Sequence, residues 1–164
     1  MNTKKCIVLI GVPAAGKSTW LELYADKPCA VVSTDNILEG FASEEGITYD
    51  ESFAKYAKVV TPMMWKELDT RIEEEWETII VDRSNMSVKA RKLFFERVKG
   101  KGYEFHAVVF PIPEKEEWDR RLSSRPGKTI PQYVLDSMVQ SFEMPIESEG
   151  FETIITILKE KYHD

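Results

Sequence analysis

Cysteine and histidine are scarce in this sequence. The two cysteines, Cys6 and Cys29, lie far apart, and neither belongs to a C-x-x-C pair. Each stands beside an apolar run, which indicates a buried, reduced thiol with no disulfide partner. The two histidines, His106 and His163, are isolated as well, and His106 lies in an apolar run typical of a strand. The scarcity argues against a disulfide-stapled secreted domain, and we expect His106 to pack rather than to catalyse.

Long hydrophobic runs and excess positive charge are also missing. No apolar stretch approaches the ~20 residues of a membrane span. The run over residues 7–10 is too short, and too soon followed by glycine, for a signal peptide. We therefore expect a cytoplasmic protein that contacts no membrane. Because 28 acidic residues outnumber 22 basic ones, the net charge is −6. This balance excludes a broad nucleic-acid-binding surface but leaves room for a local basic cleft.

The chain of 164 residues has the length of a single domain, which we assign to residues 1–164. Short apolar runs alternate with segments of helical periodicity. The runs cover residues 6–10, 30–33, 78–81, 105–110 and 151–157. Continuous apolar runs indicate strands covered on both faces, as in a parallel sheet. The alternation predicts a three-layer α/β fold in which helices cover both faces of a mostly parallel five-stranded sheet.

Helices are expected where apolar residues recur every three or four positions. These segments cover residues 18–24, 50–76, 87–100, 113–122 and 131–144. Asp50 and Ser87 are the expected N-caps of two of them. Pro62 predicts a kink or a break in the longest.

The most informative segment matches the phosphate-binding motif G-x-x-x-x-G-K-[ST] in full. It consists of Gly11, Val12, Pro13, Ala14, Ala15, Gly16, Lys17, Ser18 and Thr19. Its glycines let the backbone approach a phosphate, and successive amide N–H groups then form an anion-binding nest before a helix. In this motif Lys17 reaches the β- and γ-phosphates, and the Ser18 hydroxyl binds magnesium. The segment predicts a P-loop fold that binds ATP and Mg²⁺.

Two aspartates follow predicted strands, and strand carboxyl ends line the ligand crevice of α/β sheets. Asp35 comes 18 residues after Lys17 and is the candidate base that takes a proton from an acceptor hydroxyl. Its alternative role is to cap a helix over residues 36–40. Asp82 ends the third run as a Walker B aspartate does, which predicts a contact with magnesium, direct or through water. Its alternative role is that of a turn residue.

Basic and amide side chains follow Asp82. We expect Arg83, Asn85 and Arg91 to bind the substrate together with Asp35, because an arginine can bind a phosphate through two parallel hydrogen bonds. These residues place donors on the acceptor side of the predicted site.

A second group of arginines follows the fourth run. Arg121 and Arg125 belong to a segment over residues 114–131 that we expect to act as a lid. Closure of this lid brings the Arg125 guanidinium onto the transferring phosphoryl group, with Arg121 on the nucleotide. For Arg120 a surface salt bridge is the competing interpretation.

Residues 10–20, 33–35 and 82–86 resemble the polynucleotide-kinase-like P-loop kinases, a family that includes the 5′-kinase domain of bacteriophage polynucleotide kinase. Residues 121–125 and 130–138 resemble the same family. The resemblance implies a P-loop kinase fold with adenylate-kinase-like topology. It also implies ATP-dependent phosphorylation of the 5′-hydroxyl of DNA or RNA, in nucleic-acid modification or repair. Asp35 would be the general base, Lys17 and Ser18 the phosphate and magnesium ligands, and Arg125 the transition-state arginine.

The sequence departs from this family at two points. The family often carries an arginine three residues after the base, which holds the 3′-phosphate of the acceptor, whereas Leu38 occupies that position here and cannot donate a hydrogen bond. The chain also lacks the D-x-D motif of a phosphatase partner. Other acceptors therefore stay open: a hydroxymethylated base in DNA, as for a 5-hydroxymethyluracil DNA kinase, a nucleoside, or a small metabolite. A slow nucleotide-binding switch is a third hypothesis, although the guanine-reading N-K-x-D motif is absent.

Overall fold

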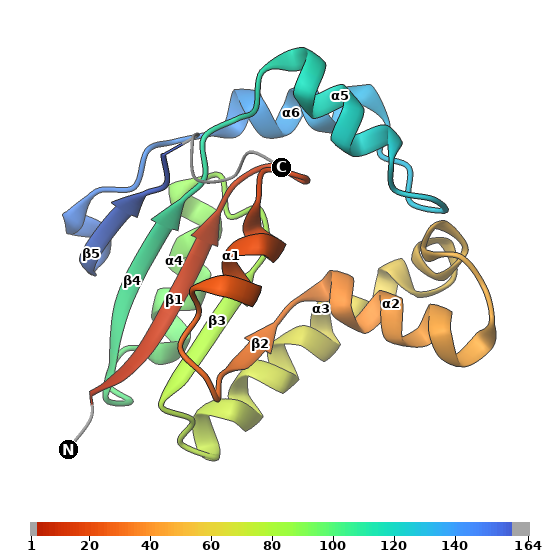
Figure 1. The fold of residues 1–164 in the computed structure, drawn as a ribbon. Coiled ribbons are helices and arrows are strands. Elements are labelled where there is room, and N and C mark those ends of the chain that lie inside the picture. Colours follow the sequence, from red (N-terminus) through yellow and green to blue (C-terminus); the bar gives the residue numbers. More distant parts are fainter. Residues whose placement is uncertain (1–2, 159–164) are drawn as a thin grey trace.

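Five strands form one parallel sheet in the computed structural model, which describes residues 3–158 (Figure 1). The strands are β1 (Lys4–Ile10), β2 (Ala30–Val32), β3 (Thr78–Asp82), β4 (Tyr103–Val109) and β5 (Phe151–Thr156). Their order across the sheet is β2-β3-β1-β4-β5, and every neighbouring pair is parallel. The five predicted strands and the parallel sheet are confirmed.

Helices cover both faces of this sheet, which confirms the predicted three-layer α/β fold. They are α1 (Lys17–Leu23), α2 (Thr34–Glu45), α3 (Tyr49–Glu73), α4 (Val88–Val98), α5 (Lys115–Ser123) and α6 (Gln132–Ser141), with a short 3-10 helix η1 (Glu147–Glu149). Figure 1 shows α5 and α6 beyond the carboxyl ends of the strands, with α2 and the start of α3 beside them. These four elements therefore enclose the edge at which ligands of α/β proteins bind.

The core explains why the strands are apolar on both faces. Cys6, Val8 and Leu9 of β1 are fully buried, and they pack in one cluster with Met64 and Leu68 of α3. Burial raises the pKa of the Cys6 thiol to about 12, so Cys6 stays protonated and unreactive at neutral pH. Cys6 is buried as expected, whereas Cys29 is only partly buried. No helix within residues 3–158 combines the length and apolarity needed to cross a bilayer.

Helix starts differ from the sequence expectation at two points. Ser33 is the N-cap of α2, and its hydroxyl oxygen accepts a hydrogen bond from the Asn36 amide at 3.2 Å. Asp35 therefore lies inside the first turn of α2 and is not its cap. Thr48, not Asp50, is the N-cap of α3, where it forms a reciprocal capping box with Glu51.

Helix α3 runs unbroken through Pro62, so the predicted break does not occur. Tertiary packing stabilises the helix in addition to its backbone hydrogen bonds, because Val60, Met64 and Leu68 form a buried stripe on one face. Packing of this stripe compensates for the hydrogen bond that proline removes. Ser87 caps α4 as expected, and its hydroxyl oxygen accepts from the Ala90 amide at 3.1 Å.

Candidate active site

The phosphate-binding loop connects the buried end of β1 to α1. Two of its residues adopt left-handed backbone conformations, Ala14 with φ 62° and Gly16 with φ 105°. A side chain at Gly11 would meet Phe110, because a Cβ atom there would lie 2.9 Å from that of Phe110. The Lys17 ammonium donates to the Gly11 carbonyl at 2.9 Å, so it lies inside the curve of the loop. This geometry matches the predicted cradle for a phosphate group.

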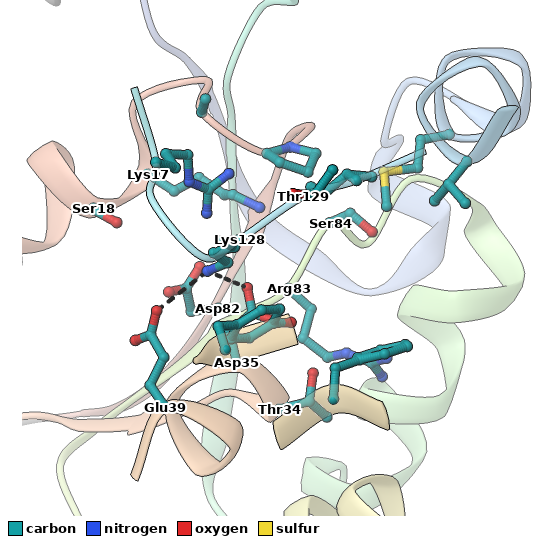
Figure 2. A pocket seen from close by; sticks show the side chains of 18 of the residues that line it. Lys17, Ser18, Thr34, Asp35, Glu39, Asp82, Arg83, Ser84, Lys128 and Thr129 are labelled. Carbon is teal, nitrogen blue, oxygen red and sulfur yellow. Dashed lines mark hydrogen bonds and ion pairs between the residues drawn. The ribbon is translucent and has the colours of Figure 1, made fainter. Parts of the chain in front are cut away.

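A pocket of about 630 Å³ opens beside this loop, at the carboxyl ends of the strands. Figure 2 shows Lys17 and Ser18 on one side of it and Asp35, Asp82 and Arg83 on another. The predicted site residues that line it are Pro13, Ala14, Gly16, Lys17, Ser18, Thr19, Asp35, Asp82, Arg83, Arg121 and Arg125. The other loop residues shape the cradle from behind: Val12 is fully buried and Ala15 is 6% exposed.

Asp35 faces the pocket with both carboxylate oxygens hydrogen-bonded. The Tyr49 hydroxyl donates to Oδ1 at 2.7 Å, and the Lys128 ammonium donates to Oδ2 at 3.3 Å. Burial by itself raises the pKa of Asp35, but the hydrogen bond from Tyr49 and the charge of Lys128 outweigh it and lower that pKa. Asp35 is therefore a carboxylate at neutral pH, as a proton acceptor must be.

Asp82 lies at the end of β3 and lines the same pocket as Ser18. Burial and the charge of Asp35 raise the pKa of Asp82, while Lys17 opposes this shift. A divalent cation beside Asp82 would relieve this penalty. Within residues 3–158, no group of three or more His, Cys, Asp or Glu side chains could hold a metal. A donor set of one carboxylate and one hydroxyl fits Mg²⁺, which keeps several water and phosphate ligands.

Burial also lowers the pKa of Lys17, although the carboxylates of Asp82 and Asp35 act in the opposite direction. Two carboxylates and one ammonium therefore interact electrostatically at one edge of the pocket. Such clusters of perturbed groups in a cleft are typical of functional sites.

Cations of α5 and of the loop over residues 124–131 close the pocket from the other side. Arg121 donates from Nη1 to the Ala14 carbonyl at 3.0 Å, which ties α5 to the phosphate loop. Arg125 lines the pocket, and its Nη1 atom is buried without a hydrogen-bond partner in the described chain. A buried, unsatisfied guanidinium nitrogen is costly unless an anion completes it, and a phosphate oxygen would do so. Arg120 instead pairs with Glu117 on the surface, at 2.6 Å.

The expectation that Arg91 binds substrate is not met. Its side chain is fully buried and pairs with Glu149, with 2.8 Å between Nε and Oε1. Its remaining donors bind the backbone carbonyls of Asn85, Met86 and Glu143. The reason is the position of Arg91 on α4, since it belongs to the buried stripe that also contains Phe94 and Val98 of that helix.

Asn85 does not line the main pocket either. It is 4% exposed, with φ 50°, and its side-chain amide donates to the Leu9 carbonyl at 2.8 Å. Asn85 thus fastens the turn after β3 to the end of β1. Arg83, two residues earlier, lines the pocket instead.

The sequence did not predict several other residues of the pocket, and Glu39, Tyr49 and Lys128 are those that interact with Asp35 or with each other. Leu38 is 1% exposed and packs inside the protein, whereas its neighbour Glu39 lines the pocket. Position 38 therefore has no access to an acceptor. Lys128 lies three residues after Arg125, and this continuation of the basic segment was the available signal.

The sequence and the fold were compared with those of known proteins. A family model described as an AAA domain matches residues 6–145. No protein among the curated sequences matches significantly. Among solved structures, a protein of Chloroflexus aurantiacus J-10-fl proposed to be a kinase has a TM-score of 0.69 at 16% identity, over 99% of this chain and 92% of that one.

Two further structures share the fold. The Pnkp1/Rnl/Hen1 RNA repair complex contains a chain with a TM-score of 0.63 at 19% identity, over 86% of this chain and 44% of that one. An unliganded sugar kinase of Janibacter sp. HTCC2649 has a TM-score of 0.59 at 23% identity, over 96% of this chain and 89% of that one. All three likenesses show a shared P-loop kinase-like fold.

Proposed function

The chain belongs to the AAA domain family, and from this premise we propose that it is an ATP-dependent kinase that transfers the γ-phosphate to a hydroxyl group. One observation carries the proposal: Lys17, Asp35 and Arg125 line a single pocket, and the Nη1 atom of Arg125 is buried there without a hydrogen-bond partner in the described chain. A phosphate cradle, a proton acceptor and a cation for the transferring group are the parts that phosphoryl transfer requires.

Each residue has a distinct role in this proposal. Lys17 and the loop amides bind the β- and γ-phosphates, and Asp35 orients the acceptor hydroxyl and accepts its proton. Arg125 stabilises the charge that develops on the transferring phosphoryl group, and Arg121 holds α5 against the loop. Ser18 and Asp82 would hold Mg²⁺, which neutralises phosphate charge when bound. We further propose that α5 and the loop over residues 124–131 form the lid of the site.

The acceptor that we place first is the 5′-hydroxyl end of DNA or RNA. Arg83 lies beside Asp35, and its guanidinium forms no hydrogen bond within the described chain, so it is available for an acceptor phosphate. A second hollow of about 190 Å³ adjoins the main pocket through Arg83, Ser84 and Met138, with Trp65 in its wall. Its size and apolar lining suit a nucleobase next to the reacting hydroxyl. The fold shared with a chain of an RNA repair complex supports this acceptor.

A smaller acceptor is the second candidate, and Glu39 is the observation that favours it. Its carboxylate lines the pocket one residue after the position at which the polynucleotide-kinase-like family often carries an arginine for the acceptor phosphate, and a carboxylate repels a phosphate. A hydroxymethylated base, a nucleoside or a small metabolite does not require a phosphate contact at that point. The fold shared with a sugar kinase fits this alternative.

One panel of acceptors with γ-labelled ATP tests both candidates. It includes 5′-OH DNA, 5′-OH RNA, a 3′-mononucleotide, duplex DNA with hydroxymethyluracil, free nucleosides and sugars. We expect label on the 5′-OH oligonucleotides, and none with Lys17→Ala, which removes the cation of the phosphate loop. Label only on nucleosides, sugars or modified bases would replace the first acceptor with the second. Tight ATP binding with label on no acceptor would contradict the kinase proposal and favour a nucleotide switch.

A further inference from the structure

Lys128 and Tyr49 together occupy both oxygens of the Asp35 carboxylate. Resting on the kinase function above, we propose that Lys128 holds the place of the acceptor hydroxyl at Oδ2 of Asp35 and is displaced by it. In the same arrangement Tyr49 is a positioning residue that keeps Oδ1 fixed. Lys128 would then determine how readily the site accepts an acceptor.

The contacts of Lys128 support this role. Its ammonium lies 3.3 Å from Oδ2 of Asp35 and 3.3 Å from Oε1 of Glu39, as Figure 2 shows. It also lies over the Tyr49 ring, 4.4 Å from the centroid. The Lys128 side chain is only 12% exposed, whereas those of Asp35 and Glu39 are about half exposed, at 50% and 53%. The cation is therefore enclosed between two carboxylates that solvent and an acceptor can reach.

The backbone around Lys128 is fixed on the first turn of α3. The Asp50 amide donates to the Gly127 carbonyl at 2.9 Å, and the Asp50 carboxylate accepts from the Thr129 amide at 2.9 and 3.1 Å. Gly127 has φ 70°, and a Cβ atom there would lie 3.1 Å from the Thr48 Cβ. These contacts, which we call the clasp, join residues 127–129 to residues 48–50. Lys128 therefore reaches Asp35 from an anchored backbone.

The Lys128 ammonium lies equally far from the carboxylates of Asp35 and Glu39, at 3.3 Å from each. It can therefore give up its contact with Asp35 without a movement of this backbone. When an acceptor hydroxyl binds Oδ2 of Asp35, the ammonium keeps its contact with Glu39. The acceptor oxygen then forms its bond to the γ-phosphorus, its proton passes to Asp35, and the bond from the γ-phosphorus to the bridging oxygen breaks with its electron pair on ADP. Lys128 would then neutralise charge beside the reacting atoms.

The charged groups around Asp35 set the expected pH effect. Asp35 is faced by Lys17 from α1, Asp82 and Arg83 from β3 and its following turn, and Tyr49 from α3. Glu39 of its own helix and Arg125 and Lys128 of the lid complete the set. Lys128 lowers the pKa of Asp35 by its charge and its hydrogen bond. Removal of Lys128 therefore raises that pKa, and the acidic limb of the pH profile of kcat/KM moves to higher pH.

Lys128→Met tests the proposal, with Lys99→Met as the matched control. Lys99 is an exposed lysine at the end of α4 whose ammonium pairs with Glu96 at 2.6 Å, and it does not line the pocket. For Lys128→Met we expect the acceptor KM to fall roughly threefold to fivefold, because the acceptor no longer displaces an ion pair. The KM for ATP stays constant, and the acidic limb moves to higher pH. Lys99→Met changes none of these values.

Glu39→Gln is an independent variant for which we expect the opposite change in the acceptor KM. Without the Glu39 charge the ammonium stays with Asp35, so the acceptor KM rises. A raised acceptor KM in Lys128→Met would show that Lys128 binds the acceptor, and a raised KM for ATP would show that it binds the nucleotide. Either result overturns the proposal, as do unchanged KM values in both variants. If the wild-type protein transfers phosphate to no acceptor, the proposed function fails and this inference fails with it.

Discussion

Asp35 is the residue on which the proposed chemistry depends, and its environment is built by two other elements. Tyr49 from the first turn of α3 and Lys128 from the loop before α6 both donate to it. Proximity of Asp35 to the phosphate loop follows from the sheet order, because β2 and β1 both lie next to β3. The role of a carboxylate at this point is to accept the proton of a hydroxyl that attacks a phosphate.

Asp35→Asn tests this role at the level of one atom. The amide keeps the shape of the side chain but cannot accept the proton, so we expect kcat to fall by about 10²- to 10⁴-fold. ATP binding, measured by calorimetry, should persist because the phosphate loop is untouched. Asp69→Asn, an exposed site that pairs with Arg97, is the control and should retain full activity. A near-normal kcat in Asp35→Asn would show that another group is the base.

Tyr49→Phe tests how the carboxylate is held. The variant removes the 2.7 Å hydrogen bond to Oδ1, which favours the ionised form of Asp35. The pKa of Asp35 therefore rises, and a larger fraction is protonated and inactive on the acidic side. We expect the acidic limb of the kcat/KM profile to move to higher pH. Tyr103→Phe removes a hydroxyl that donates to the Trp76 carbonyl away from the site, and its profile should match that of the wild type. An unmoved limb in Tyr49→Phe would exclude the positioning role.

The elements of this fold were largely predictable because each strand is a continuous apolar run, as in residues 6–10 and 78–81. Helix boundaries were less so. Asp50 was chosen as a cap because aspartate is a good N-cap, yet Thr48 and Glu51 carry the T-x-x-E pattern of a capping box. Asp50 is used instead by the clasp. Contacts between residues about 80 positions apart cannot be seen in local patterns.

Thr48→Ala tests the capping box. The substitution removes the hydroxyl oxygen that accepts from the Glu51 amide at 3.1 Å, while Ala remains compatible with the backbone. We expect the free energy of unfolding to fall by about 1 kcal/mol, measured by chemical denaturation. Thr70→Ala is the control, since the Thr70 hydroxyl bonds only to the Lys66 carbonyl within the same exposed helix surface. Equal stability of both variants would show that the box contributes nothing.

At the scale of the molecule, buried polar contacts of one side chain hold the segment before β5 to helix α4. Arg91 joins α4 to the segment around Glu143 and to η1. A basic residue soon after an active-site strand suggests an exposed substrate ligand, and this is why the sequence predicts that role for Arg91. Its spacing of three and seven residues from Phe94 and Val98 pointed inward instead. A charged residue can thus occupy a buried position in the apolar stripe of a helix. Its residue type alone does not reveal this, but its spacing from the apolar residues does.

Arg91→Met tests this structural role. The variant leaves the Glu149 carboxylate buried without its partner, so we expect a loss of about 3–5 kcal/mol in the free energy of unfolding. Arg97 lies on the same helix as Arg91 and forms an exposed ion pair with Asp69 of α3. Arg97→Met should lower the free energy of unfolding by no more than about 1 kcal/mol. If Arg91→Met folds with wild-type stability but loses acceptor binding, the substrate-binding assignment would be restored.

The clasp has a topological consequence for the acceptor. Residues 127–129 meet residues 48–50 beyond the carboxyl ends of the strands, and the segments on either side of this contact line the same pocket. Figure 1 shows the loop between α5 and α6 reaching towards the junction of α2 and α3. The clasp thereby bridges the two walls of the pocket, one formed by α2 and α3 and the other by the segment between α5 and α6. For the polynucleotide acceptor that we propose, such a bridge would favour a free end of the strand over its middle.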